Sequence, residues 1–125
     1  MLTDTCKTRL LEFIIEDIDR VAIVDNTTVT TDALIATLTN NAYPTAIAIV
    51  WGIVASGSVT TTNKAEDSNP INFSMKLNAS PKKAILYTNG SNYPLMVFDL
   101  GTPIPSYTTR GSYYLESIGL YFTEV

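Results

Sequence analysis

Residues 33–63 read ALIATLTNNAYPTAIAIVWGIVASGSVTTTN and form the most unusual segment of the chain. It contains no Asp, Glu, Lys or Arg, although charged side chains normally keep exposed protein surfaces hydrated and apart. Its polar side chains come mainly from Thr, Ser and Asn, which lose less free energy than charged groups when water is removed. A segment of this composition is either buried within the protein or covered by another subunit, and the sequence leaves both interpretations open.

This uncharged tract divides into an apolar half and a Thr/Ser half. The run AIAIVWGIV at residues 46–54 is apolar on both faces, which predicts a central β-strand. Residues 58–62, SVTTT, follow a turn at Gly57 and are expected to pair with that strand. We expect Trp51 in the core and the Thr/Ser half at the surface, where it can form a subunit interface. The interface candidates in this half are Ser58, Thr60 and Thr62.

One helix is predicted ahead of the tract, over residues 2–19. Apolar residues recur there at steps of three and four, which is the spacing of a single helix face. Thr3 or Thr5 can cap the start of the helix, and Asp4 lies near the positive end of its dipole. The residues expected on the buried face are Leu2, Cys6, Leu10, Phe13, Ile14 and Ile18.

The rest of the chain has the pattern of antiparallel β-strands. Residues 71–77 alternate apolar and polar side chains, as a half-buried strand does. The sequence NGSN at residues 89–92 predicts a hairpin, because Asn-Gly readily adopts positive φ. Residues 32–38 fit either a short helix or a strand. The strands are expected at residues 20–25, 46–54, 58–62, 71–77, 84–88, 95–100 and 113–123.

This order of elements predicts a mainly β fold in one domain, residues 1–125. The helix at 2–19 is expected to lie against a jelly-roll-like antiparallel β-sandwich formed by residues 20–125. With 125 residues, 46% of them hydrophobic, the chain is long enough to bury a core without help from a disulfide or a metal.

The composition argues against several classes of function. The chain has 8 basic and 12 acidic residues, a net charge of −4, and therefore no basic surface for nucleic acid. It has no His, and Cys6 is its single Cys, so the usual general base, the His-activated nucleophiles and the common zinc ligand sets are missing. We expect no catalytic residue, no cofactor and no metal. The N-terminus does not read as a signal peptide, and the longest apolar run is too short for a membrane helix, so we expect a soluble chain made in a cytoplasm.

Tyrosines in polar loops form a second set of candidate site residues. An exposed Tyr ring stacks on sugars or packs at protein interfaces while its hydroxyl forms hydrogen bonds. A carbohydrate-binding module is therefore the alternative to a structural protein, although edge packing in a β-sandwich explains the same residues without a ligand. The tyrosines concerned are Tyr43, Tyr93, Tyr107, Tyr113 and Tyr114.

An enzyme is the third hypothesis. Asp99 and Glu116 are the two carboxylates embedded in apolar sequence. Two buried carboxylates at a suitable separation can hydrolyse a glycosidic bond, but no motif supports that chemistry here. We expect a protein without enzymatic activity.

Several segments follow one another in a recognisable order. A helix that opens with Leu-Thr leads into a short strand (LTDTCKTRLLEFIIEDIDRVAIVD, residues 2–25), and a Tyr is later followed by a β-rich run to Trp and a Gly-Ser segment (AYPTAIAIVWGIVASGSVTTTN, residues 42–63). An alternating strand, INFSMKL, then precedes the hairpin KKAILYTNGSNYPLMVFDLG at residues 82–101. This order resembles that of small virion proteins of tailed bacteriophages, described as minor tail or tail-fibre-like proteins.

The resemblance implies a structural role in the virion. The resemblance favours a protein associated with the tail. A capsid decoration (cement) protein is the alternative, because such proteins are also small, β-rich and uncharged at their contacts. The implied partners are other copies of the chain, for which a trimer suits either place, and a larger phage structural protein of the tail or the capsid. A host glycan is the further partner that the tyrosines would allow.

Overall fold

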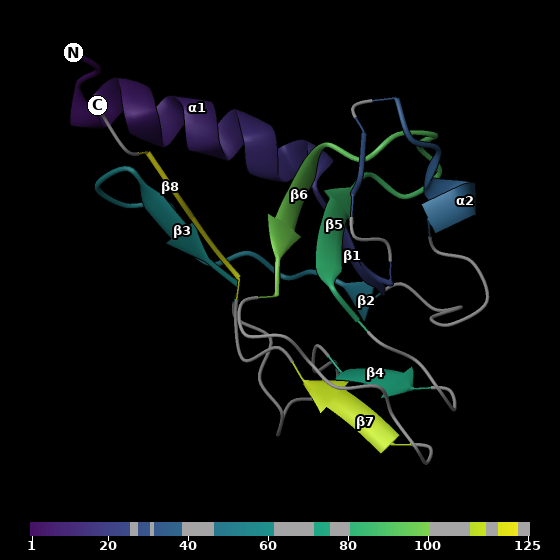
Figure 1. The fold of residues 1–125 in the computed structure, drawn as a ribbon. Helices are drawn as coiled ribbons and strands as arrows, with labels where there is room; N and C mark the ends of the chain where they lie inside the picture. The colour runs from purple at the N-terminus through teal and green to yellow at the C-terminus, as the bar shows by residue number, and fades with distance from the viewer. Residues whose placement is uncertain are drawn as a thin grey trace.

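Figure 1 shows the fold in a computed structural model, which describes residues 1–25, 28–30, 32–38, 47–61, 72–75, 81–100, 111–114 and 118–122. This part of the chain is mainly β, with antiparallel sheets and an N-terminal helix, as the sequence predicts. The helices are α1 (Asp4–Asp17) and α2 (Ile35–Leu38). The strands are β1 (Arg20–Val24), β2 (Ile47–Ala48), β3 (Ser58–Thr60), β4 (Asn72–Met75), β5 (Lys83–Tyr87), β6 (Met96–Asp99), β7 (Gly111–Tyr114) and β8 (Gly119–Tyr121).

Helix α1 begins after Thr3, whose Oγ1 accepts a hydrogen bond from the Cys6 N–H at 3.2 Å, and this confirms the predicted cap. Its buried face differs in part from the expected one. Leu11 is buried, whereas Leu10 and Phe13 are 40% and 68% exposed. The helix carries two adjacent apolar stripes and contacts β3 along one side. The outer stripe, which includes Leu10 and Phe13, is not covered by the described residues.

Replacing Thr3 by alanine is expected to lower the free energy of unfolding by about 1 kcal/mol, because the Cys6 N–H loses its acceptor. Denaturant unfolding monitored by circular dichroism measures this change. Thr5→Ala is the matched control: Thr5 lies inside the exposed first turn, where alanine is a good helix former. Equal destabilisation by both substitutions would contradict the capping role of Thr3.

A four-stranded antiparallel sheet, in the order β2-β1-β5-β6, forms the centre of the fold (Figure 1). Its two inner strands pair along their whole lengths, with Ala22 opposite Ile85, and their sequences RVAIV and KAILY are apolar at almost every position. The expectation that residues 46–54 form the central strand is therefore wrong. Only Ile47–Ala48 pairs with β1, at the edge of the sheet, because β1 and β5 already occupy its buried centre.

After β2 the chain runs towards a second, two-stranded sheet. The Gly52 N–H donates to the Thr60 carbonyl at 2.8 Å, so the expected pairing between the two halves of the uncharged tract is confirmed over a short length. The turn between them contains Gly57 with a φ of +75°, a conformation that favours glycine. The ladder partner of β3, however, is β8.

The later strands confirm the local predictions and correct a longer one. The hairpin of β5 and β6 forms around Gly90, whose φ is +85°, and the strand expected at 71–77 is present as β4, with Phe73 buried. The single strand expected at 113–123 is wrong, because β7 pairs with β4 and β8 pairs with β3. The ambiguous stretch at 32–38 contains the single turn of α2.

The core lies on both faces of the four-stranded sheet. One cluster joins β1 and β5 to α2, and its buried members are Ala22, Val24, Ile35, Leu38, Ile85 and Tyr87. The other joins the opposite face to residues from β4 and from the start of β8. Its buried members are Ile18, Val21, Ile23, Ile49, Phe73, Ala84, Leu86 and Ile118.

Candidate functional site

The predicted interface residues are divided among three places. Ser58 and Thr60 are exposed on the outer face of β3, on the same side as Tyr121 of β8, which is 73% exposed. Tyr93 is 49% exposed in the loop between β5 and β6. The backbone of Tyr113 lies in β7 opposite Phe73. The predictions for Tyr43, Thr62, Tyr107 and Glu116 fall outside the described residues, and for Tyr114 only the backbone in β7 is described.

The apolar half of the uncharged tract is only partly buried. Trp51 packs against the core, and its Nε1–H donates to the Ile18 carbonyl at 2.7 Å, in agreement with the core prediction. Val50 and Ile53, in contrast, are 49% and 93% exposed. The sequence does not reveal this, because an exposed Ile in an apolar run looks the same as a buried one. An isolated exposed Ile is ordinary in a folded protein. Here Val50 and Ile53 are both exposed on a segment that contains no charged residue.

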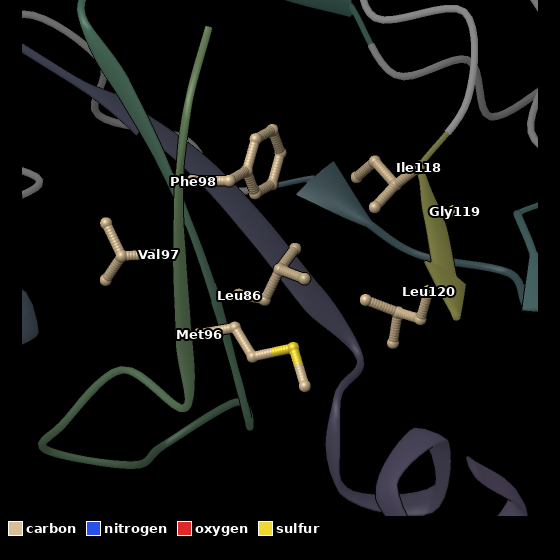
Figure 2. Close-up of a pocket in the computed structure, with 7 residues that line it drawn as sticks. All are labelled: Leu86, Met96, Val97, Phe98, Ile118, Gly119 and Leu120. Atoms are coloured by element: carbon tan, nitrogen blue, oxygen red, sulfur yellow. The ribbon is translucent and has the colours of Figure 1, made fainter. Parts of the chain in front are cut away.

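A groove of about 530 Å³ lies between β6 and β8, a size in the usual range for binding sites. Figure 2 shows Met96 and Phe98 extending from β6 towards Leu120 of β8 and Ile118, which directly precedes β8, with Leu86 of β5 between them. Val97 and Gly119 complete the lining. None of these seven described residues carries a charge, so the groove suits an uncharged, apolar occupant.

Sequence reasoning missed this groove. Met96, Phe98 and Leu120 alternate with outward residues along short strands, and that pattern predicts core residues. They lie on strands of two different sheets, and which strands become neighbours depends on strand order. The alternation of apolar and polar residues does not predict strand order. The outer edges of β6 and β8, which no described strand covers, become visible only in the folded chain.

The carboxylate of Asp99 forms an exposed ion pair rather than a buried acidic site. Lys83 Nζ donates to Asp99 Oδ1 across β5 and β6, and the Asp99 side chain is 74% exposed. Asp99 therefore lacks the buried setting on which the enzyme hypothesis depended. The described residues contain no group of three or more His, Cys, Asp or Glu side chains placed to hold a metal ion.

Tyr87, at the end of β5, has a perturbed acid–base equilibrium. Burial of the phenol raises its pKa above the ordinary value of 10.0, the opposing charge of Arg20 lowers it, and Asp19 raises it further. The neutral phenol is thus the form that the folded chain favours.

Stability is expected to fall as the pH rises above about 10, because the unfolded chain then loses the Tyr87 proton more readily than the folded chain. Below the unfolded pKa both states keep the proton, so the contribution is fully present there. Denaturant unfolding of the wild type and of Tyr87→Phe across this alkaline range measures the effect. The variant should lose stability less steeply, and parallel curves at every pH would show that Tyr87 contributes nothing.

None of the helices in the described part of the chain is long and apolar enough to span a bilayer. Comparisons of the whole chain with protein-family models, with curated proteins and with solved structures found no match.

Proposed function

We propose that this protein is a non-enzymatic structural component of a tailed phage particle that assembles with copies of itself through uncharged β-surface. The observation that carries the proposal is the exposure of Ile53 and Val50 on a tract that contains no charged residue. Apolar surface of this kind is favourable to cover with protein, at roughly 25 cal/mol per Å² removed from water. The resemblance in segment order to small virion proteins supplies the biological setting.

We propose further that residues 20–125 complete a jelly-roll-like β-sandwich within one domain. The support is the packing of one face of the four-stranded sheet against residues from β4 and β8, as two layers of a sandwich would pack. The opposite face is covered by α2. Such a compact unit suits either a tail-associated position or a capsid surface, and a trimer suits both.

The outer stripe of α1 provides a contact surface for a larger phage structural protein of the tail or the capsid. Leu10 and Phe13 lie on this stripe and are 40% and 68% exposed. Their spacing places them on one side of the helix, as in helices that dock into an apolar groove.

An antibody raised against the purified chain tests the virion role. It should label intact tailed particles from the lysate in which the chain is produced, at a fixed position seen by electron microscopy. Label that stays in the particle-free fraction, with none on the particles, would contradict the proposal.

A carbohydrate-binding module is the second candidate, favoured by the half-exposed Tyr93. The Ser91 Oγ donates to the Tyr93 carbonyl at 3.2 Å, which fixes the backbone of this loop. If the loop binds glycans, Tyr93→Ala should abolish binding on a glycan array, because the stacking ring is lost, while Tyr121→Ala retains it. An array on which the wild type binds no glycan removes this candidate.

A further inference from the structure

Among the described strands, β6 pairs only with β5, so its outer edge borders the groove without a described strand beside it. Antiparallel ladders alternate hydrogen-bonded and non-hydrogen-bonded pairs. The Leu100 N–H donates to the Lys82 carbonyl, and with this register Phe98 forms its backbone bonds with β5 while Val97 directs its N–H and carbonyl to the other side. No described strand lies beyond β6, and Val97 lines the groove although its side chain points away in Figure 2. Val97 therefore contributes backbone to the groove.

Strand β8 likewise pairs on one side only, with β3, in the part of the chain that the structure describes. The Thr61 N–H donates to the Ile118 carbonyl at 2.9 Å, and the Phe122 N–H donates to the Gly57 carbonyl at 3.3 Å. Between these two points the backbone of Gly119 faces away from β3. Gly119 has no side chain, so it too lines the groove with backbone.

These edges and the apolar side chains between them define the chemistry of the occupant. An extended segment can pair with the unpaired backbone of β6 and place alternate side chains on the apolar lining, which is how strand addition works. The segment must be uncharged where it enters, because the lining offers no charged partner to a buried ion.

The same chain carries a segment of this kind. Residues 50–54, VWGIV, are uncharged, and the bonds from Trp51 to Ile18 and from Gly52 to Thr60 hold the segment against the fold. Ile53 is 93% exposed on this segment and is the side chain that would enter the apolar lining, because Val50, three residues away, lies on the opposite face of an extended segment. We infer that residues 50–54 of one copy occupy the β6–β8 groove of the next copy. This inference rests on the self-assembly proposed above and names the two surfaces that meet. A head-to-tail contact of this type closes into a ring, such as a trimer, or continues as a filament.

Val97→Pro tests the groove side of the contact. Proline removes the N–H that points out of the sheet, keeps the bonds of Phe98 to β5, and is tolerated at a sheet edge. In sedimentation analysis its mass should fall to the 13.7 kDa of the monomer. Val97→Thr retains the N–H and should assemble like the wild type. If Val97→Pro does not fold, as judged by circular dichroism, Met96→Glu places a charge in the groove and gives the second test.

Ile53→Asp tests the segment side and should also yield a monomer, because a carboxylate would enter the apolar groove. Leu34→Asp is its control, since Leu34 is 44% exposed beside α2, which packs on the opposite sheet face from the groove. Mixing Ile53→Asp with Val97→Pro is the decisive step. One partner keeps an intact groove and the other an intact segment, so the mixture should form a 1:1 dimer that grows no further.

The outcomes separate this inference from the function on which it rests. A wild type that assembles while both variants also assemble overturns the inference and leaves self-assembly standing. Loss of assembly in only one of the two variants, or monomeric variants whose mixture forms no dimer, overturns the pairing of these two surfaces. A wild type that is monomeric at every concentration overturns both.

Discussion

Replacing Ile23 by alanine is expected to lower the free energy of unfolding by about 2–5 kcal/mol. Ile23 is fully buried in the central strand β1, within the cluster that joins the four-stranded sheet to residues from β4 and β8. The substitution removes apolar contacts and leaves a cavity that a sheet paired on both sides cannot readily close. Chemical denaturation followed by circular dichroism measures the loss.

Two further variants give comparison values for the loss of stability in Ile23→Ala. Ile23→Val should cost about 0.5–1.5 kcal/mol, because it deletes a single methylene. Leu95→Ala should change stability by less than about 0.5 kcal/mol, since Leu95 is 54% exposed. An Ile23→Ala variant as stable as Leu95→Ala would show that β1 does not lie at the centre of the core.

Replacing Thr61 by valine is expected to cost about 1–3 kcal/mol, although the side-chain shape is kept. Thr61 is the buried polar residue among those described, and its Oγ1 accepts a hydrogen bond from the Ile118 N–H at 2.9 Å. Valine leaves that buried N–H without a partner at the point where β8 begins. The effect is measured by denaturant unfolding and, locally, by faster hydrogen exchange at β8.

Thr60→Val is the matched control, because Thr60 is the exposed last residue of β3, directly before Thr61. Its effect should be small. Equal losses for Thr60→Val and Thr61→Val would contradict the assigned role of the Thr61 hydroxyl.

The parts of the fold that the sequence predicts well depend on neighbours along the chain. The cap at Thr3 is encoded within one helical turn, and the hairpin around Gly90 within a few residues, so both could be found by pattern alone. Strand order depends on competition between distant segments. Residues 46–54 are as apolar as β1, but the paired strands β1 and β5 form the centre of the sheet. The local sequence pattern cannot predict which of these apolar segments is central.

The candidate site was predicted less well than the fold, for a related reason. Ser58 and Thr60 are exposed as expected, because short polar residues beside Gly57 favour the surface. Ile53 and Phe13 are more exposed still, yet hydrophobicity and helical spacing predict burial for both. In the sequence, an apolar residue that is exposed on the folded chain looks the same as one that is buried in the core. Only the folded structure distinguishes the two.

The most direct test of self-assembly through uncharged β-surface is the mass of the purified wild-type protein in solution, measured by light scattering after gel filtration over a range of concentrations. Self-assembly should give a stable mass at a whole-number multiple of 13.7 kDa, with three copies the expected stoichiometry. A mass of 13.7 kDa at every concentration would contradict it, because the exposed surface around Ile53 would then have no second copy to cover it.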